Sequence, residues 1–413
     1  MKKFLFFFVL LPLLLTAQEE KKFGIEFGGF VKTDIMYDSR QTVNVREGHF
    51  LLYPKNEVLD PEGNDINAKP TFHMLSIQTR LQGKITGPDA LGAKTSGMIE
   101  AEFFGQAING SEDLNGFRLR HAIVKLDWTN TQLMIGQYWH PMFNTNCYPG
   151  TVSFNTGAPF EPFNRSPQIR VTQKFGRLSI AGTVLAQRDF TSTGPNGPST
   201  EYARNAVIPG LNLNIEYNYK NTESKTEFLI GGSLNYLAIQ PLMKSDSGYK
   251  TDTKVSCLGF SGYLKFANQA ITVKLHGYNG GNPTELTMLG GYAVKSVTDP
   301  VKGFVEYTPI RNTSFWADIH TNGKQWQFGL FGGYAKNNGS MDNIAGAIYS
   351  RGADIDYVYR ISPRVIFNAG KFRVAPEVEY TAAAYGTIAE KDVVKDAKVV
   401  GNFRFLLGVY FFF

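Results

Sequence analysis

Residues 401–413 read GNFRFLLGVYFFF, and the alternation within this stretch decides the fold. Every second side chain from Phe403 to Phe413 is apolar, whereas Asn402 and Arg404 fall between the apolar positions. Successive side chains of a β-strand point to opposite faces, so a period of two predicts a strand with one apolar face and one polar face.

The same alternation recurs along the chain. In residues 75–84 the apolar face carries Leu75, Ile77 and Leu81, while Arg80 and Lys84 fall on the polar face. We find no helical periodicity of useful length, so the pattern predicts an all-β fold of about sixteen strands. The other segments with this pattern are 25–38, 95–106, 117–128, 131–138, 168–175, 178–188, 211–219, 227–239, 258–266, 271–278, 313–321, 326–334, 355–364 and 371–381.

The connections between these segments are alternately long and short. A soluble β-sandwich also has one dry and one wet face, but it gives no reason for alternating loop lengths. Short periplasmic turns and long extracellular loops are typical of a transmembrane antiparallel β-barrel, which is therefore the predicted fold. The long connections are 39–71, 107–116, 139–167, 189–210, 240–252, 279–312, 336–353 and 384–398, and the short ones are 87–94, 129–130, 176–177, 220–225, 267–269, 322–325 and 368–370.

The last predicted strand has to pair with the first, in residues 25–37, because an open sheet edge is not tolerated in hydrocarbon. The chain ends on Phe413 with apolar residues at alternating positions before it. Such an ending is similar to the signal read by the outer-membrane assembly machinery, which we expect as a partner.

The first residues indicate export. Two lysines precede an apolar run of about twelve residues, which is too short for a spanning helix of roughly twenty. We therefore predict a signal peptide over 1–17 and a single barrel domain over 18–413. The alternative is an uncleaved N-terminal anchor.

Composition argues against several function classes. The 42 basic and 36 acidic residues leave only a small positive excess, which does not suggest a nucleic-acid partner. Cys147 and Cys257 show no metal or redox spacing, although one isolated disulfide between them stays open. The six histidines form no paired-ligand motif, and no phosphate- or dinucleotide-binding motif occurs. We therefore expect no cofactor, no metal and no enzymatic activity, with a spatially assembled Ser–His site as the alternative.

Four short phrases in the first 170 residues resemble the DcaP-type porins of Gram-negative outer membranes in order and spacing. They are GFVKTD at 29–34 with YD at 37–38, RLRHA at 118–122, GQYW at 136–139 with Phe143, and RSPQIR at 165–170. The resemblance implies a sixteen-stranded homotrimer in outer-membrane lipid, a third loop folded inward, and a preference for small anionic solutes such as dicarboxylates. One departure is the short stretch 18–24 before the first strand, which has no room for an N-terminal coiled coil.

A barrel of this width encloses water, so loop and wall residues that narrow the passage set selectivity. We expect the 139–167 connection to be the constriction. Guanidinium groups suit carboxylates, and an arginine ladder can pass anions from site to site. The alternative is that the arginines pair with lumen carboxylates and brace the wall. The predicted substrate pathway, with Arg118 and Arg120 as its best candidates, comprises Arg80, Arg118, Arg120, Arg165, Arg170, Arg360 and Arg404.

The predicted function is that of an outer-membrane porin for passive diffusion of small hydrophilic, anionic solutes. Three rival interpretations remain open at this point. They are a barrel enzyme that hydrolyses lipid, a surface-binding barrel whose loops 39–71 and 279–312 act over a blocked lumen, and a general or cation-preferring channel.

Overall fold

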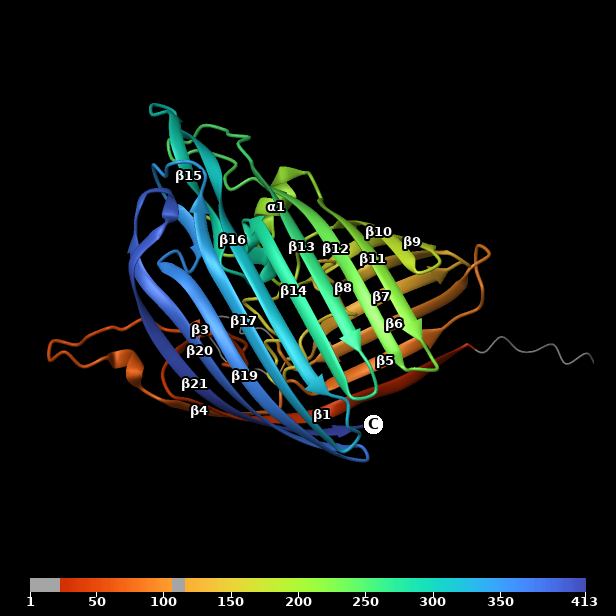
Figure 1. The fold of residues 1–413 in the computed structure, drawn as a ribbon. Helices are drawn as coiled ribbons and strands as arrows, with labels where there is room; N and C mark the ends of the chain where they lie inside the picture. The colour runs from red at the N-terminus through yellow and green to blue at the C-terminus, as the bar shows by residue number, and fades with distance from the viewer. Residues whose placement is uncertain (1–22, 106–115) are drawn as a thin grey trace, which may run out of the picture.

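The computed structural model describes residues 23–105 and 116–413, and the predicted signal peptide lies outside them. The described residues form a closed antiparallel barrel of sixteen strands, which confirms the predicted fold (Figure 1). Two short strands in line, β4 and β5, together make one of the sixteen. The barrel strands are β1 (Gly24–Asp38), β4 (Thr71–Leu75), β5 (Arg80–Thr86), β6 (Lys94–Glu102), β7 (Arg118–Asp127), β8 (Thr131–Trp139), β9 (Arg165–Phe175), β10 (Leu178–Leu185), β11 (Gly210–Asn221), β12 (Thr226–Ile239), β13 (Val255–Ala267), β14 (Ile271–Gly281), β16 (Phe304–Thr321), β17 (Trp326–Ser340), β19 (Ile355–Ala369), β20 (Phe372–Ile388) and β21 (Val394–Phe412).

The barrel closes where the first and last strands meet. β1 pairs with β21 from Phe30 opposite Phe412 to Asp38 opposite Arg404, and its other edge pairs with β4 and β5. The predicted pairing of the first and last strands is therefore correct. Closure gives every wall strand two hydrogen-bonded neighbours, as hydrocarbon requires.

The two faces of the wall differ as the alternation predicts. In β21 the side chains of Phe403, Phe405 and Phe411 are about half exposed on the outside, whereas Asn402 and Arg404 are fully buried inside the barrel. The outer face is therefore apolar and the inner face polar. Among the described residues, no helix is long and apolar enough to cross a membrane.

The wall is interrupted between β4 and β5, where a continuous strand over 75–84 was expected. The amide of Thr79 donates to the Ser76 carbonyl (3.1 Å) in a turn. This turn reverses the side-chain parity, so Ile77 is buried in the interior core cluster. Leu75 also packs against this cluster, so the prediction that Leu75 and Ile77 share the outer face with Leu81 is wrong.

Glycine is required on β1 opposite this interruption. Gly29 has a φ of 154°, and a Cβ there would lie 2.1 Å from the carbonyl oxygen of Arg80. Any other residue at position 29 would clash with the backbone of β5 and adopt a strained conformation.

Several strands continue beyond the rim that carries the long connections, so the predicted loops 279–312 and 384–398 are largely strand. β16 begins at Phe304 and forms a hairpin with β15 (Gly290–Asp299), to which β18 (Ile348–Arg351) adds an edge. β20 and β21 pair as far as Ile388 and Val394. Extended pairing satisfies backbone groups in water as well as in lipid, and the sequence pattern alone does not show where the membrane ends.

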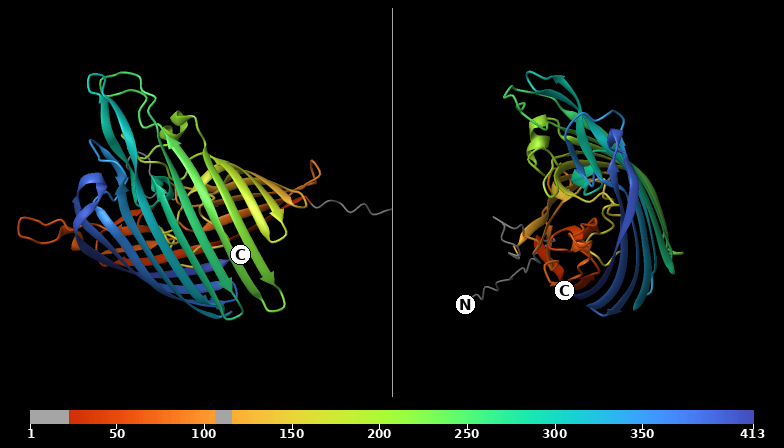
Figure 2. Two further views of the ribbon diagram at one scale, coloured as in Figure 1. Left: turned by 45° about the horizontal axis from the view of Figure 1, so that its top comes forward. Right: turned by 90° about the vertical axis from the view of Figure 1, so that its left-hand side faces the viewer.

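One hairpin lies inside the barrel. β2 (Thr42–Val45) and β3 (Phe50–Pro54) pair only with each other, and β3 contacts β20 and β21 from within (Figure 2, right). All five residues of β3 are buried. The remaining short elements are η1 (Ile66–Ala68), α1 (Glu201–Ala206), η2 (Pro283–Leu286) and η3 (Glu390–Asp392).

We expect Gly29→Val to lower the free energy of unfolding by at least about 2 kcal/mol, because it adds backbone strain to a contact with β5. The midpoint of urea unfolding, followed by tryptophan fluorescence, measures the effect. Gly24→Val in the same strand is the control, since a Cβ at Gly24 meets nothing within 4 Å. Equal midpoints for the two variants would contradict the requirement for glycine at position 29.

Candidate functional site

The third outer loop, residues 140–164 (loop L3), crosses the inside of the barrel. Its contacts reach β1, β11, β14, β16 and β19, so the loop is tied to the wall all round. These contacts are Asn144 Nδ2 to Glu216 Oε2 (3.0 Å), Lys274 Nζ to the Tyr148 carbonyl (2.9 Å), Lys32 Nζ to the Val152 carbonyl (3.0 Å), Arg360 Nη1 to the Ala158 carbonyl (2.9 Å) and Ser314 Oγ to the Phe160 carbonyl (2.9 Å).

Aromatic rings of this region form a column between two cations. The rings of Trp139 and Phe143 stack with centroids 4.1 Å apart, and Tyr148 stacks on Phe143 at 5.6 Å. Arg165 lies over the Trp139 ring at 4.4 Å, and Lys274 of β14 lies over the Tyr148 ring at 5.2 Å. Cation–π contacts thus cap both ends of the column.

The β2–β3 hairpin of the first outer loop also fills part of the lumen. Arg360 Nη2 donates to the carbonyls of Leu51 (2.9 Å) and Leu52 (3.2 Å), and Tyr385 donates to the Pro54 carbonyl (2.6 Å). The rival interpretation treated loop 39–71 as a surface element, whereas this half of it lies inside. The apolar run FLLYP at 50–54 was the only sequence sign that this part of the loop is buried, but the run alone cannot be distinguished from any other short strand.

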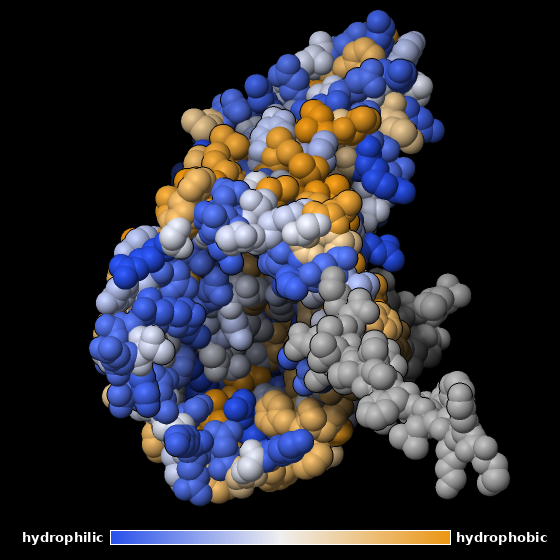
Figure 3. Space-filling model, turned by 90° about the vertical axis from the view of Figure 1, so that its right-hand side faces the viewer, coloured by the Kyte–Doolittle hydropathy of each residue, from blue (hydrophilic) through white to orange (hydrophobic). Residues whose placement is uncertain are grey.

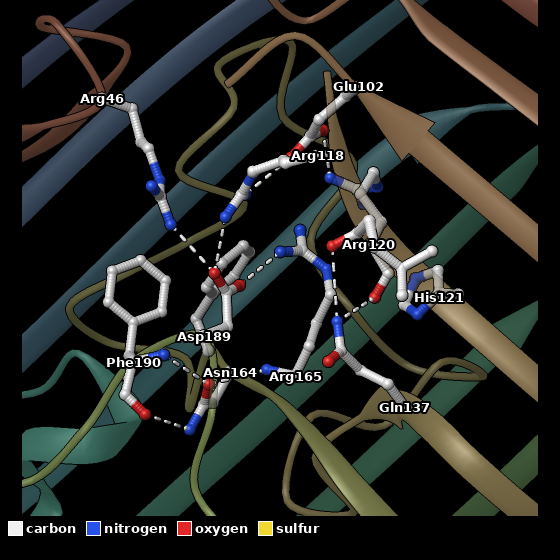
Figure 4. Close-up of polar contacts among 12 residues, drawn as sticks. Arg46, Glu102, Arg118, Arg120, His121, Gln137, Asn164, Arg165, Asp189 and Phe190 are labelled. Carbon is white, nitrogen blue, oxygen red and sulfur yellow. Dashed lines mark hydrogen bonds and ion pairs between the residues drawn. The ribbon is translucent and has the colours of Figure 1, made fainter. Parts of the chain in front are cut away.

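One group of arginines surrounds Asp189, in the connection after β10 (Figure 4). Arg118 Nη1 and Arg46 Nη2 lie 2.7 Å and 2.9 Å from Asp189 Oδ1, and Arg165 Nη1 binds Oδ2. Burial raises the pKa of Asp189, but the guanidinium groups of Arg165, Arg118 and Arg46 outweigh it and hold the pKa at about 2. Asp189 therefore stays ionised at neutral pH. Sequence reasoning missed Arg46 and Asp189, which lie in different loops.

A second group of ion pairs, around Glu102 of β6, adjoins the first because Arg118 belongs to both. Arg118 Nη2 lies 2.7 Å from Glu102 Oε1, and Arg120 binds both Glu102 and Glu100, the latter with Nε at 2.7 Å. Arg80 is a looser neighbour, 3.6 Å from Glu102 and 3.7 Å from Glu100.

A β-bulge on β7 sets this geometry. The pairing of β6 with β7 shifts between Glu100 and Ala101, so that Glu100 faces His121 and Ala101 faces Leu119. Arg120 is the extra residue, and Arg120 and His121 are both buried inside. The bulge also shifts the side-chain parity of β7, which is why Lys125 falls at a position that strict alternation from Leu119 would make apolar.

These residues form a basic cluster, which we name the arginine cluster: Arg46, Arg80, Arg118, Arg120 and Arg165 with Glu100, Glu102 and Asp189. Five guanidinium groups face three carboxylates. Several donor nitrogens, including Nη2 and Nε of Arg165, have no hydrogen-bond partner among the described residues. The cluster therefore keeps an excess positive charge, and its unpaired donor nitrogens are buried.

The other predicted arginines lie apart from the cluster. Arg404 makes two hydrogen bonds to Asp38, at 2.9 Å and 2.7 Å, and Arg360 holds the hairpin and loop L3 by their carbonyls. Both are buried and tie elements together, as the bracing alternative describes. Arg170 of β9 instead donates to Gln168 and to the Trp139 carbonyl (3.1 Å), and it lines a cavity of about 130 Å³ under loop L3.

The end of the barrel that carries the short turns is hollowed, with mainly hydrophilic residues around the opening (Figure 3).

Cys147 and Cys257 are both free, so they do not form the isolated disulfide that the sequence allowed. Within residues 23–105 and 116–413, no group of three or more His, Cys, Asp or Glu residues is arranged to hold a metal ion.

We expect Asp189→Asn to lower the free energy of unfolding by about 3–5 kcal/mol, because it leaves buried arginines without their carboxylate. Thermal unfolding measures the effect. Asp356→Asn is the matched control, since the partly exposed pair with Lys336 contributes at most about 1 kcal/mol. A similar small shift for both variants would show that Asp189 does not hold the arginines.

No protein-family model matches the chain, and no curated protein does. Among solved structures, the outer membrane channel DcaP of Acinetobacter baumannii superimposes with a TM-score of 0.70 at 17% identity, covering 95% of this chain and 98% of that one. The trimer form of OmpT, an outer membrane protein of Vibrio cholerae, gives 0.53 at 13% identity, covering 95% and 99%. OprB of Pseudomonas putida gives 0.53 at 9% identity, covering 94% of each chain. The chain thus has the fold of outer-membrane channels. Its closed barrel has an apolar outer face, as expected of a protein that lies in the outer membrane.

Proposed function

We propose that this chain is a porin of a Gram-negative outer membrane through which small hydrophilic anions diffuse passively. The observation that carries the proposal is the arginine cluster, in which five guanidinium groups face three carboxylates beside the two loops that fill the lumen. Loop L3, within the predicted 139–167 connection, and the β2–β3 hairpin are the elements that narrow the passage.

The ion pairs and the excess charge have different roles in this proposal. Carboxylates fix the guanidinium groups in place, and the two guanidinium groups in excess supply the attraction for an anion. A low-dielectric wall focuses that field along the water-filled passage. Arg80 and Arg118, whose side chains are 20% and 18% exposed, can bind a carboxylate through charge-assisted hydrogen bonds and release it to the next site. The ladder and the bracing of the wall are therefore compatible.

The proposed partners follow from the outer surface and the last strand. The exposed apolar face would contact outer-membrane lipid, and part of it would contact two further copies in a homotrimer. The trimer form of the similar Vibrio cholerae protein supports this assembly. Phe413, whose amide donates to Gly29 (3.2 Å), would be read by the assembly machinery before closure. Passive diffusion needs no catalysis and no cofactor, so we propose no enzymatic activity.

The decisive measurement is the reversal potential of purified protein in a planar bilayer under a KCl gradient. We expect the wild type to prefer chloride and the double variant Arg118→Ala/Arg120→Ala to lose most of that preference. Arg311→Gln is the control for loss of one positive charge outside the cluster, because Arg311 binds Asn279 away from it. Conductance with no anion preference would overturn the role of the cluster.

Two other results would overturn the porin itself. Calcium-dependent release of fatty acid from micelles would indicate the lipid hydrolase. A folded protein that opens no conductance would indicate a surface-binding barrel.

We also expect that replacing residues 42–54 by a short Gly-Ser linker raises single-channel conductance, because the hairpin occupies part of the lumen. The matched control is removal of residues 57–64 from the exposed half of the same loop, which should leave conductance unchanged. Equal conductance for both deletions would place the narrowest point elsewhere.

A further inference from the structure

Arg170 differs from the other six predicted arginines in its partners. Each of the six lies within 4.0 Å of a carboxylate oxygen, whereas Arg170 forms no ion pair with any described residue. Its Nε and Nη2 donate to Gln168 Oε1 at 3.1 Å and 2.8 Å, both neutral contacts. Arg170 therefore brings to the cavity that it lines a positive charge that no described carboxylate contacts.

We propose that this cavity is a second solute subsite, distinct from the arginine cluster, that binds one carboxylate of a hydroxyl-rich monoanion such as a sugar acid. The proposal rests on the proposed function, since it names a class of solute for the same passage. It predicts a preference for hydroxylated monocarboxylates over dicarboxylates.

A buried hydroxyl beside Arg170 provides the second donor of a binding site for the solute carboxylate. Thr183 of β10 stands directly opposite Arg170 in the register of β9 and β10 and lines the same cavity. Its side chain is only 4% exposed, and its hydroxyl has no hydrogen-bond partner among the described residues. Leaving a buried hydroxyl unpaired is unfavourable, so a ligand that accepts from Thr183 is favoured. One carboxylate can accept from Thr183 and from the Arg170 guanidinium together.

The rest of the cavity wall suits hydroxyl groups. From Thr183 the wall continues toward the short turn at 176–177 through Ala181 and Ser179, with Thr172 and Asn214 beside Ala181 in the register. The small side chain of Ala181 leaves the space, and the polar neighbours can donate to or accept from a hydroxylated solute. The volume of about 130 Å³ is close to that of a cavity that holds benzene, which is room for the carboxylate end of a sugar acid.

Glu216 limits the negative charge of the solutes that the cavity can bind. This residue lines the cavity and accepts hydrogen bonds from Asn144 (3.0 Å), Asn146 (2.9 Å) and Tyr263 (3.2 Å), which hold it in place. Its carboxylate can accept from a solute hydroxyl but repels a second carboxylate. The cavity therefore selects against dicarboxylates.

The subsite is separate from the arginine cluster because the aromatic column stands between them. Trp139 carries Arg165 on one side of its ring and Phe143 on the other, while its carbonyl accepts from Arg170. Trp139 and Phe143 line the Arg170 cavity as well.

The test is isothermal titration calorimetry of the full-length barrel in detergent with sodium gluconate and sodium succinate. We expect gluconate to bind the wild type more tightly than succinate. Arg170→Gln should weaken gluconate binding at least about tenfold through loss of a charged donor, and Thr183→Val about threefold through loss of a neutral one. Arg177→Gln at the turn of the same hairpin is the control and should bind gluconate like the wild type.

Glu216→Gln provides an independent check, because it should narrow the difference between the two ligands by raising succinate affinity. Succinate binding tighter than gluconate in the wild type, or unchanged gluconate affinity in both Arg170→Gln and Thr183→Val, would overturn the subsite. Bilayer conductance of the same preparations separates the two proposals. Conductance without gluconate binding removes the subsite and keeps the porin, and binding without conductance keeps the subsite and removes the porin.

Discussion

The backbone hydrogen bonds between β1 and β21 are the interaction on which the rest of the structure depends. A sheet of this length would otherwise expose two rows of unpaired amide and carbonyl groups to hydrocarbon, each costing several kcal/mol. Closing the sheet fixes which side chains face inward, and this brings Arg404 of the last strand to Asp38 of the first. The interior is polar because the exterior has to be apolar.

Inside the wall, charge and apolar packing have separate tasks. Loop L3 and the β2–β3 hairpin pack their aromatic residues into a core within the lumen, with Phe50 against Phe163 at 4.9 Å. Phe104, in the connection after β6, joins this core against Phe154 at 4.5 Å. Arginines at the margin of this core either donate to backbone carbonyls of the loops or bind the same carboxylates as their neighbours. The same residue type thus braces the loops at Arg360 and, in our proposal, receives solutes in the arginine cluster.

Much of the wall was predictable from the sequence because a period of two, read against loop length, is a local signal. The closure, the polar inner face and the number of strands all follow from it. Leu75 and Ile77 were misplaced because a turn of a few residues reverses parity without changing composition. The inner hairpin at 50–54 was missed because an apolar run does not show what it packs against. Asp189 and Arg46 were missed because their contact joins two loops far apart in sequence, and Arg170 could not be told from its neighbours without the positions of the carboxylates.

The column of Trp139, Phe143 and Tyr148 between Arg165 and Lys274 has a mechanical consequence. Stacked rings resist compression, and a cation at each end ties the column to β9 on one side and β14 on the other. Loop L3 is thereby a rigid strut, held to the wall at both ends of the column, and not a mobile flap. A solute has to fit the gap that the strut leaves, so the molecule would act on size as a rigid sieve before its charges act on chemistry.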